Sequence, residues 1–100
     1  MKISNMLSTN GKAVPNQFVI VTEGRGSLGN FTKKEVFQSY KSIIAERIKW
    51  PNHPVEVRLD KNKWDYSNTT GKYRNEFLGE TKAETQRKID SGEYVLIDLN

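Results

Sequence analysis

The stretch that decides the fold is Gln17-Phe18-Val19-Ile20-Val21-Thr22. It is rich in β-branched residues and is bounded by Pro15-Asn16 and Gly24, a pattern that predicts a strand. Residues 55–60 alternate apolar and charged side chains, which predicts a second, half-buried strand. Apolar residues at 3–7 predict a short strand near the start, and Tyr94, Leu96 and Leu99 predict either an edge strand or a packed tail near the end.

Two short helices are predicted in the last third of the chain. Ser67 suits the N-cap of the first helix, and Gly79 stands where a C′ glycine ends it. Thr81 and Glu84 spell a capping box for the second helix, which Gly92 ends. On this second helix we expect Ala83 and Ile89 to face inward and Glu84 to pair with Lys88.

Residues 31–49 fit two alternatives. Thr32 and Glu35 form a capping box before apolar residues at helical spacing, which favours one helix. Val36-Phe37 and Ile43-Ile44 also suit two short strands joined by a turn. The residues alone leave both alternatives open.

Length and composition predict one domain over residues 1–100, with 35% hydrophobic and 28% charged residues. The chain has no cysteine, which excludes disulfides and thiolate metal sites. No signal peptide or membrane-spanning run is evident, so we expect a cytoplasmic protein with no membrane partner. The net charge is +4, and residues 1–50 hold eight Lys and Arg against three Asp and Glu. Such asymmetry suits a polyanion or an acidic protein surface.

Gly24-Arg25-Gly26-Ser27-Leu28-Gly29 matches the G-x-G-x-x-G pattern after a predicted strand. With a helix starting at Thr32 and Glu46 as the distant acid, it resembles a dinucleotide site. The alternative is a hairpin loop whose glycines permit positive φ. We favour the loop, because a dinucleotide site needs several parallel βαβ units and the sequence shows too few.

Few groups of residues in the sequence could form a catalytic site. His53 is the single histidine and lies between two prolines with no evident nucleophile beside it. Glu56, Asp60 and Asp65 would form a nuclease centre only if they converged on one cation, and the alternation of residues 55–60 places Glu56 on the outer face. We therefore predict no enzyme activity, no cofactor and no metal.

Aromatic and cationic residues alternate between positions 61 and 74, a pattern that suits single-stranded nucleic acid because bases stack on rings and phosphates pair with cations. The alternative is that Trp64, Tyr73 and Phe77 belong to the core, with Tyr66 exposed. The candidate binding residues are Lys61, Lys63, Trp64, Tyr66, Lys72 and Arg74.

Several segments resemble a family of small uncharacterised proteins carried by bacteriophages and plasmids. They are Phe37-Gln38-Ser39-Tyr40 and its continuation to Ala45, Trp64-Asp65-Tyr66-Ser67 with Thr69-Thr70 and Lys72-Tyr73, residues 85–94, and Asn16-Gln17-Phe18. The resemblance implies strands rather than a helix around residues 35–48. It implies no established activity, but a mobile-element setting in which small proteins disable host defences.

We therefore predict an α+β fold, with an antiparallel sheet of about four to five strands and two short C-terminal helices packed on one face. The expected function is a non-catalytic phage or plasmid accessory protein that binds and inhibits a host defence protein or nucleoprotein complex in the bacterial cytoplasm, in the manner of an anti-CRISPR protein. The alternative function is binding of single-stranded DNA or RNA. The oligomeric state is left open.

Overall fold

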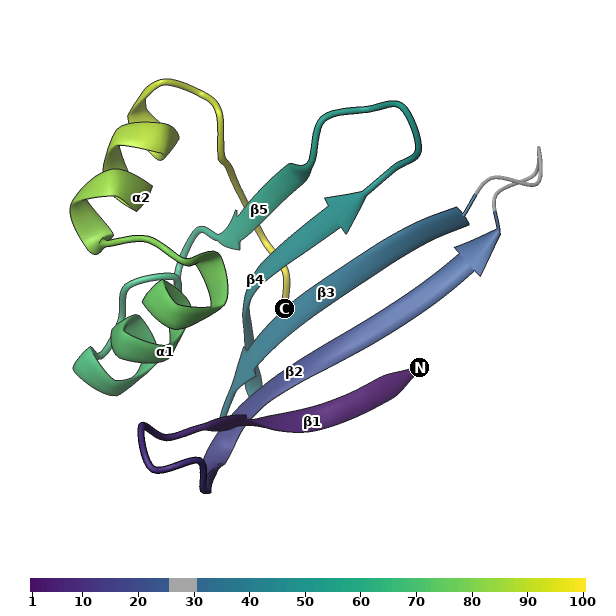
Figure 1. Ribbon diagram of the computed structural model, residues 1–100. Helices are drawn as coiled ribbons and strands as arrows, with labels where there is room; N and C mark the ends of the chain where they lie inside the picture. The colour runs from purple at the N-terminus through teal and green to yellow at the C-terminus, as the bar shows by residue number, and fades with distance from the viewer. Residues whose placement is uncertain (26–30) are drawn as a thin grey trace.

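Six strands form one sheet in the order β1-β2-β3-β4-β5-β6 (Figure 1). The computed structural model describes residues 1–25 and 31–100. The strands are β1 (Lys2–Leu7), β2 (Ala13–Arg25), β3 (Phe31–Ser39), β4 (Ser42–Lys49), β5 (Glu56–Asp60) and β6 (Val95–Ile97). Two helices, α1 (Asn68–Leu78) and α2 (Lys82–Asp90), lie between β5 and β6 in the chain.

Strands β1 to β5 form an antiparallel meander in which each strand pairs with the one before it. Residues 31–49 are two strands joined at Tyr40, which has a φ of 56°. The two-strand alternative is confirmed, and the helix opened by a capping box at Thr32 is wrong. Cross-strand pairing explains the outcome, because Phe37 of β3 lies opposite Val19 of β2 and Ala45 of β4.

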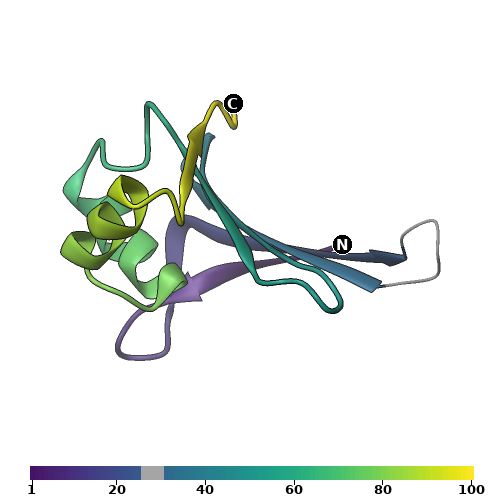
Figure 2. The ribbon, with the colours of Figure 1, turned by 90° about the horizontal axis from the view of Figure 1, so that it is seen from above.

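The last strand departs from this pattern, because β6 pairs with β5 in parallel. Parallel neighbours need a crossover, and α1 and α2 supply it. Figures 1 and 2 show both helices gathered on one side of the sheet, near one end, while the strands extend beyond them. The α+β prediction is confirmed, with six strands instead of four to five. Among the residues described, no helix has the length and apolar character that a membrane crossing requires.

The core lies between this sheet and α1. Phe37, Ala45 and Leu59 follow one another across β3, β4 and β5, and all three are fully buried. The rings of Phe37 and Phe77 stack with centroids 5.8 Å apart. Tyr73 is buried in the same cluster, and half-buried Trp64 packs against it. The aromatic residues of α1 therefore belong to the core.

Some contacts of helix α2 differ from those predicted. The capping box of Thr81 and Glu84 is confirmed, and Ile89 packs against the core. Ala83, however, is exposed, and Thr85 is the buried residue of the helix. The carboxylate of Glu84 accepts the Thr81 backbone N–H, while Lys88 pairs with acidic residues outside the helix. The predicted pair of Glu84 and Lys88 is wrong because capping holds Glu84 at the helix start.

Candidate binding site

The six predicted binding residues surround the start of α1, but they do not share one exposed surface. Lys61, Tyr66 and Lys72 are exposed, Lys63 and Trp64 are half-buried, and Arg74 is only 1% exposed. A surface shared by Tyr66, Lys72 and Arg74 is therefore absent from the structure.

Arg74 is a structural cation. Its Nη1 donates to the backbone carbonyl of Trp64 and to Asp65 Oδ1, and its Nη2 donates to Asn75 Oδ1. Its guanidinium lies 5.1 Å from the centroid of the Trp64 ring. These contacts tie α1 to the segment that follows β5, which leaves little of the guanidinium for a ligand.

The aromatic rings of this region already have cations from the chain over them. Lys63 Nζ lies 5.6 Å from the Tyr66 ring centroid, and Lys72 Nζ lies 5.3 Å from that of Tyr73. A base that stacked on Tyr66 would have to displace Lys63, which reduces the gain from stacking.

A hollow of about 520 Å³ lies beside the first turn of α1. Its lining residues include Lys72 and Lys82, yet Asp65 occupies the same wall and bonds Lys82 at 2.7 Å and Arg74 at 3.3 Å. Burial raises the pKa of Asp65, but the hydrogen bonds from Lys82 and Arg74 outweigh this effect and hold the pKa below its ordinary value. The hollow therefore carries an ionised carboxylate, which pairs with Lys82 and Arg74 and neutralises part of their positive charge.

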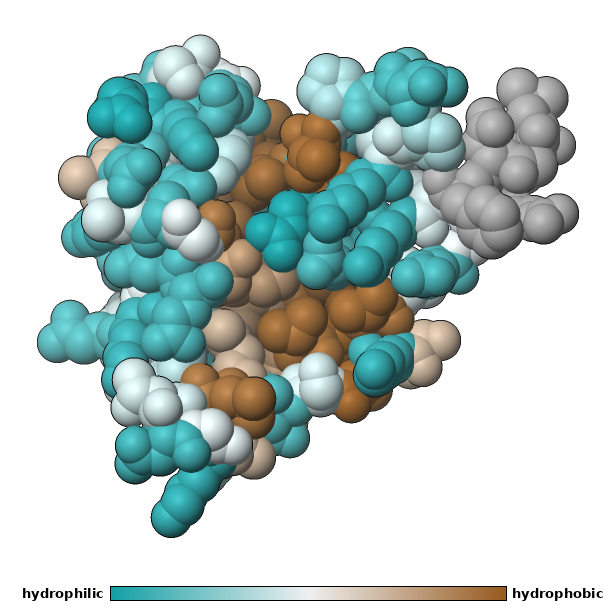
Figure 3. Space-filling view, in the orientation of Figure 1, coloured by the Kyte–Doolittle hydropathy of each residue, from teal (hydrophilic) through white to brown (hydrophobic). Residues whose placement is uncertain are grey.

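A second concave region lies between the helices and β5, and we call it the helix groove. Its volume is about 430 Å³. Figure 3 shows apolar side chains gathered between the polar helices and the strands on this side of the molecule. The lining residues are Arg47, Pro54, Val55, Val57, Leu78, Glu80, Lys88, Glu93 and Tyr94.

An adjoining hollow of about 480 Å³ extends the helix groove along the connector between β4 and β5. The two share Pro54, Val55 and Glu93, and the second also includes Trp50 and His53. Val55 is 51% exposed and Trp50 is 44% exposed, so this rim presents apolar surface to solvent. Large apolar residues beside polar ones are typical of protein-binding surfaces.

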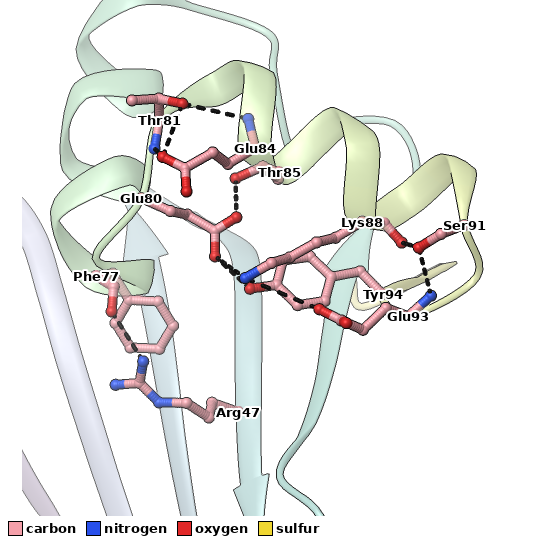
Figure 4. Close-up of polar contacts among 10 residues, drawn as sticks. All are labelled: Arg47, Phe77, Glu80, Thr81, Glu84, Thr85, Lys88, Ser91, Glu93 and Tyr94. Carbon is pink, nitrogen blue, oxygen red and sulfur yellow. Dashed lines mark hydrogen bonds and ion pairs between the residues drawn. The ribbon is translucent and has the colours of Figure 1, made fainter.

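The floor of the helix groove is built around Glu80, which follows the C-cap of α1 (Figure 4). Its carboxylate accepts hydrogen bonds from the Tyr94 hydroxyl, from Thr85 Oγ1 at 2.8 Å and from Lys88 Nζ at 3.2 Å. Lys88 also reaches Glu93 at 3.8 Å. One carboxylate thus joins α2 to the segment before β6 and fixes the shape of the groove.

Arg47 closes the other side of the floor. Its Nη1 donates to the Phe77 carbonyl at 3.0 Å, and its guanidinium lies 4.7 Å from the Phe77 ring centroid (Figure 4). Nε and Nη2 of Arg47 bond the carboxylate of Glu35, which Lys49 also contacts. Burial raises the pKa of Glu35, but the hydrogen bonds from Arg47 and Lys49 outweigh this effect and hold the pKa below its ordinary value.

The ionisable groups of the floor are arranged for rigidity. Burial first, and then the hydrogen bond to Glu80, raise the pKa of Tyr94 to about 12. The hydrogen bond to Glu80 also raises the pKa of Lys88, so the amine stays protonated. Both shifts oppose use of these groups as a base or a nucleophile at neutral pH. The groove is suited to holding a partner's side chain.

The remaining sequence candidates do not assemble into a site. Residues 26–29 of the glycine-rich motif lie outside the described residues, and Thr32 is in strand β3. Glu46, the proposed dinucleotide acid, is 5% exposed and bonds Lys34 and Arg58. Within residues 1–25 and 31–100, no three His, Asp or Glu side chains are placed to share a metal ion.

Sequence reasoning missed the helix groove. The connector from Trp50 to Pro54 contains two prolines, which marks a rigid turn but does not indicate what it faces. Glu80 and Lys88 are eight residues apart, which is not a spacing of neighbours within one helix. Only the crossover to β6 brings Tyr94 to Glu80.

Comparison with known proteins gives a family but no function. No curated protein and no solved structure matches the chain. A family model described as a family of unknown function, DUF8033, matches residues 1–93. The chain belongs to the DUF8033 family of unknown function.

Proposed function

We propose that this protein is a non-catalytic binding protein that docks a protein partner on the helix groove. The observation that carries the proposal is the exposed apolar rim at Trp50 and Val55 above the fixed polar floor of Glu80 and Arg47. A rigid floor reduces the entropy lost on binding, and an apolar rim supplies the gain from burial.

The kind of partner is proposed from the resemblance to proteins that bacteriophages and plasmids carry. The segments around Phe37-Gln38-Ser39-Tyr40 and Trp64-Asp65-Tyr66-Ser67 resemble those of phage and plasmid proteins. In that setting the partner is a host defence protein or nucleoprotein complex in the bacterial cytoplasm, which the chain inhibits as anti-CRISPR proteins do. The net charge of +4 favours approach to an acidic protein or to a complex that contains nucleic acid.

The test is protection of a phage from a CRISPR system inside a bacterium. Cells whose CRISPR nuclease targets the phage express the wild-type chain, Val55→Lys or Tyr66→Ala. We expect the wild type and Tyr66→Ala to restore plaques and Val55→Lys to fail, because a charge at the rim opposes burial against the partner. Direct binding of the purified nuclease complex by each variant gives a second readout. No protection by the wild-type chain from any of a panel of CRISPR nucleases would end the CRISPR part of the proposal.

A second candidate is binding of single-stranded DNA or RNA, which the exposure of Tyr66 beside Lys63 favours. Its test is the affinity for a labelled oligonucleotide at low and high salt, because phosphate contacts weaken as salt rises. Under this candidate Tyr66→Ala lowers the affinity and Val55→Lys leaves it unchanged, the reverse of the pattern for a protein partner. Arg74→Ala is unsuitable as a probe because it removes a buried structural cation.

A further inference from the structure

The face of the sheet turned away from the helices carries a run of apolar side chains. Phe37 and Arg47 point toward Phe77 of α1, so their strand neighbours Val36 and Glu46 point to the opposite face. The strand register extends this helix-free face across the sheet. Its apolar members include Ile3, Phe18, Ile20, Val36, Ile43, Ile48 and Val95.

Three of these residues form one unbroken row. Ile3 of β1 lies opposite Ile20 of β2, and Ile20 lies opposite Val36 of β3. Directly opposed residues of neighbouring strands are only about 5 Å apart, so the row is continuous. Phe18 lies two residues from Ile20 along β2 and widens the row on the same face.

A second layer does not cover this row in the part of the chain that the structure describes. The half-buried apolar residues that pack against the core are Met6, Val14, Val19, Trp64, Leu78 and Ile89, all outside the row. Ile3 is 58% exposed, and Ile20 and Val36 are half-buried. An antiparallel sheet face that meets water usually carries polar residues at these positions. An apolar row there indicates a face that is covered in the working state of the protein.

The charges on the rest of the helix-free face largely pair with one another. Glu46 bonds Lys34 at 3.1 Å and Arg58 at 3.3 Å, and Arg58 also bonds Glu56 at 3.0 Å. Buried Asp60, two residues beyond Arg58 in β5, adds a further negative charge, so this face has no positive excess although the whole chain has a net charge of +4. Such a face gives no electrostatic attraction to nucleic acid or to an anionic membrane. Because its exposed charges are paired, it accepts a second face of the same kind with little repulsion.

We propose that a second copy of this chain covers the helix-free face, so that two sheets pack face to face about a two-fold axis. The second copy presents the same apolar row and the same paired charges, which makes the interface self-complementary. Two sheets packed in this way lie about 10 Å apart with their side chains interdigitated. The helix groove stays open in this dimer, because it lies on the helix side of the sheet.

Pairing of the two copies through the edge of β1 is the competing arrangement. The β1–β2 register shifts between Asn5 and Leu7, and the Asn5 side chain donates to the Val14 carbonyl. Bulges at a sheet edge oppose pairing with another strand. The face is therefore the preferred interface.

The experiment measures the mass of the purified chain by sedimentation and light scattering over a concentration series up to about 1 mM, the range of weak dimers. We expect the mass to approach twice 11.5 kDa. Ile20→Lys should raise the dissociation constant at least about a hundredfold, because a symmetric interface loses the side chain twice. Val55→Lys is the matched control, since it places the same charge on the rim of the helix groove, and it should leave the dimer intact.

Circular dichroism checks that Ile20→Lys is folded. If it is not, Ile3→Lys replaces it, because the side chain of Ile3 is already largely exposed and its change leaves the core untouched. A chain that is monomeric throughout the series overturns the proposal. A dimer that both face variants leave unchanged also overturns it and points to the β1 edge. These outcomes are independent of phage protection, so the two proposals fail separately.

Discussion

Replacing Asp60 by alanine should be among the most destabilising changes of a polar residue in this chain. Asp60 ends β5 and is 1% exposed. Its Oδ1 accepts the backbone N–H of Leu99 at 2.8 Å, and its Oδ2 accepts that of Asn62 at 3.2 Å. The side chain thus joins the end of β5 to the segment that follows β6.

The magnitude follows from these two bonds. A hydrogen bond to a charged acceptor contributes about 1.5–3 kcal/mol, and a buried donor left without a partner costs a similar amount. Asp60→Ala removes both bonds and should lower the free energy of unfolding by about 3 kcal/mol. Asp60→Asn keeps one acceptor oxygen of the same shape and should lose about half of that.

The pH dependence provides an independent check. Burial raises the pKa of Asp60, but the hydrogen bonds from Leu99, Asn100 and neighbouring backbone N–H groups outweigh this effect and hold the pKa below its ordinary 3.8. The folded state therefore holds the proton more weakly than the unfolded state does. This part of the stability is present above the unfolded pKa and is lost as the pH falls through the folded pKa. In Asp60→Asn the loss of stability in this acid range should be smaller.

The assay is urea unfolding of each variant, followed by tryptophan fluorescence, at pH 7 and in steps below pH 5. Asp90→Ala is the matched control because it removes one negative charge from an exposed site, and it should change the free energy of unfolding by less than about 0.5 kcal/mol. If Asp60→Ala and Asp90→Ala lose the same stability, the role assigned to the buried carboxylate is refuted.

Further predictions concern other parts of the fold. Arg74→Ala should lower the free energy of unfolding by about 2–4 kcal/mol, measured by urea unfolding, because a buried cation with several partners is lost. Tyr94→Phe should cost about 1–2 kcal/mol by removing a donor to Glu80. It should also flatten the loss of stability that the wild type shows between pH 10 and 12, since the stability from a raised folded pKa is complete below the unfolded pKa and is lost as the pH rises through the folded pKa. Gly71→Ala should raise the melting temperature, since it lies inside α1 with ordinary contact distances to its neighbours, whereas Gly79→Ala should lower it because φ is +71° there.

Local sequence signals predicted those parts of the fold that local physics determines. The β-branched run at residues 17–22 lies within β2, and the caps at Ser67 and Gly79 bound α1 as expected. Between residues 31 and 49 local signals conflicted, because a capping box and an apolar stripe coexist with β-branched pairs. Pairing with β2 and β5 decided in favour of strands, and pairing depends on segments distant in the sequence.

The candidate binding residues show why site prediction was harder. Exposure of Tyr66 was predicted from its place before a cap, and the structure agrees. Arg74 was a candidate because cations and aromatic rings alternate around it, but it is 1% exposed, with its guanidinium near the Trp64 ring and bonded to Asp65. The helix groove depends on Glu80 meeting Tyr94 across the crossover, which no spacing in the sequence encodes.

The parallel pairing of β5 and β6 has a consequence for the order of folding. Strands β1 to β4 pair with near neighbours in sequence, so their contacts close short loops and form early. The pairing of Arg58 in β5 with Val95 in β6 forms later, because α1 and α2 separate the two strands in the sequence. We expect the meander to be organised while the segment from Tyr94 onward is still undocked. In native-state hydrogen exchange, the amides of Lys61 and Leu99, which hold this segment, should then open at lower free energy than those of β3.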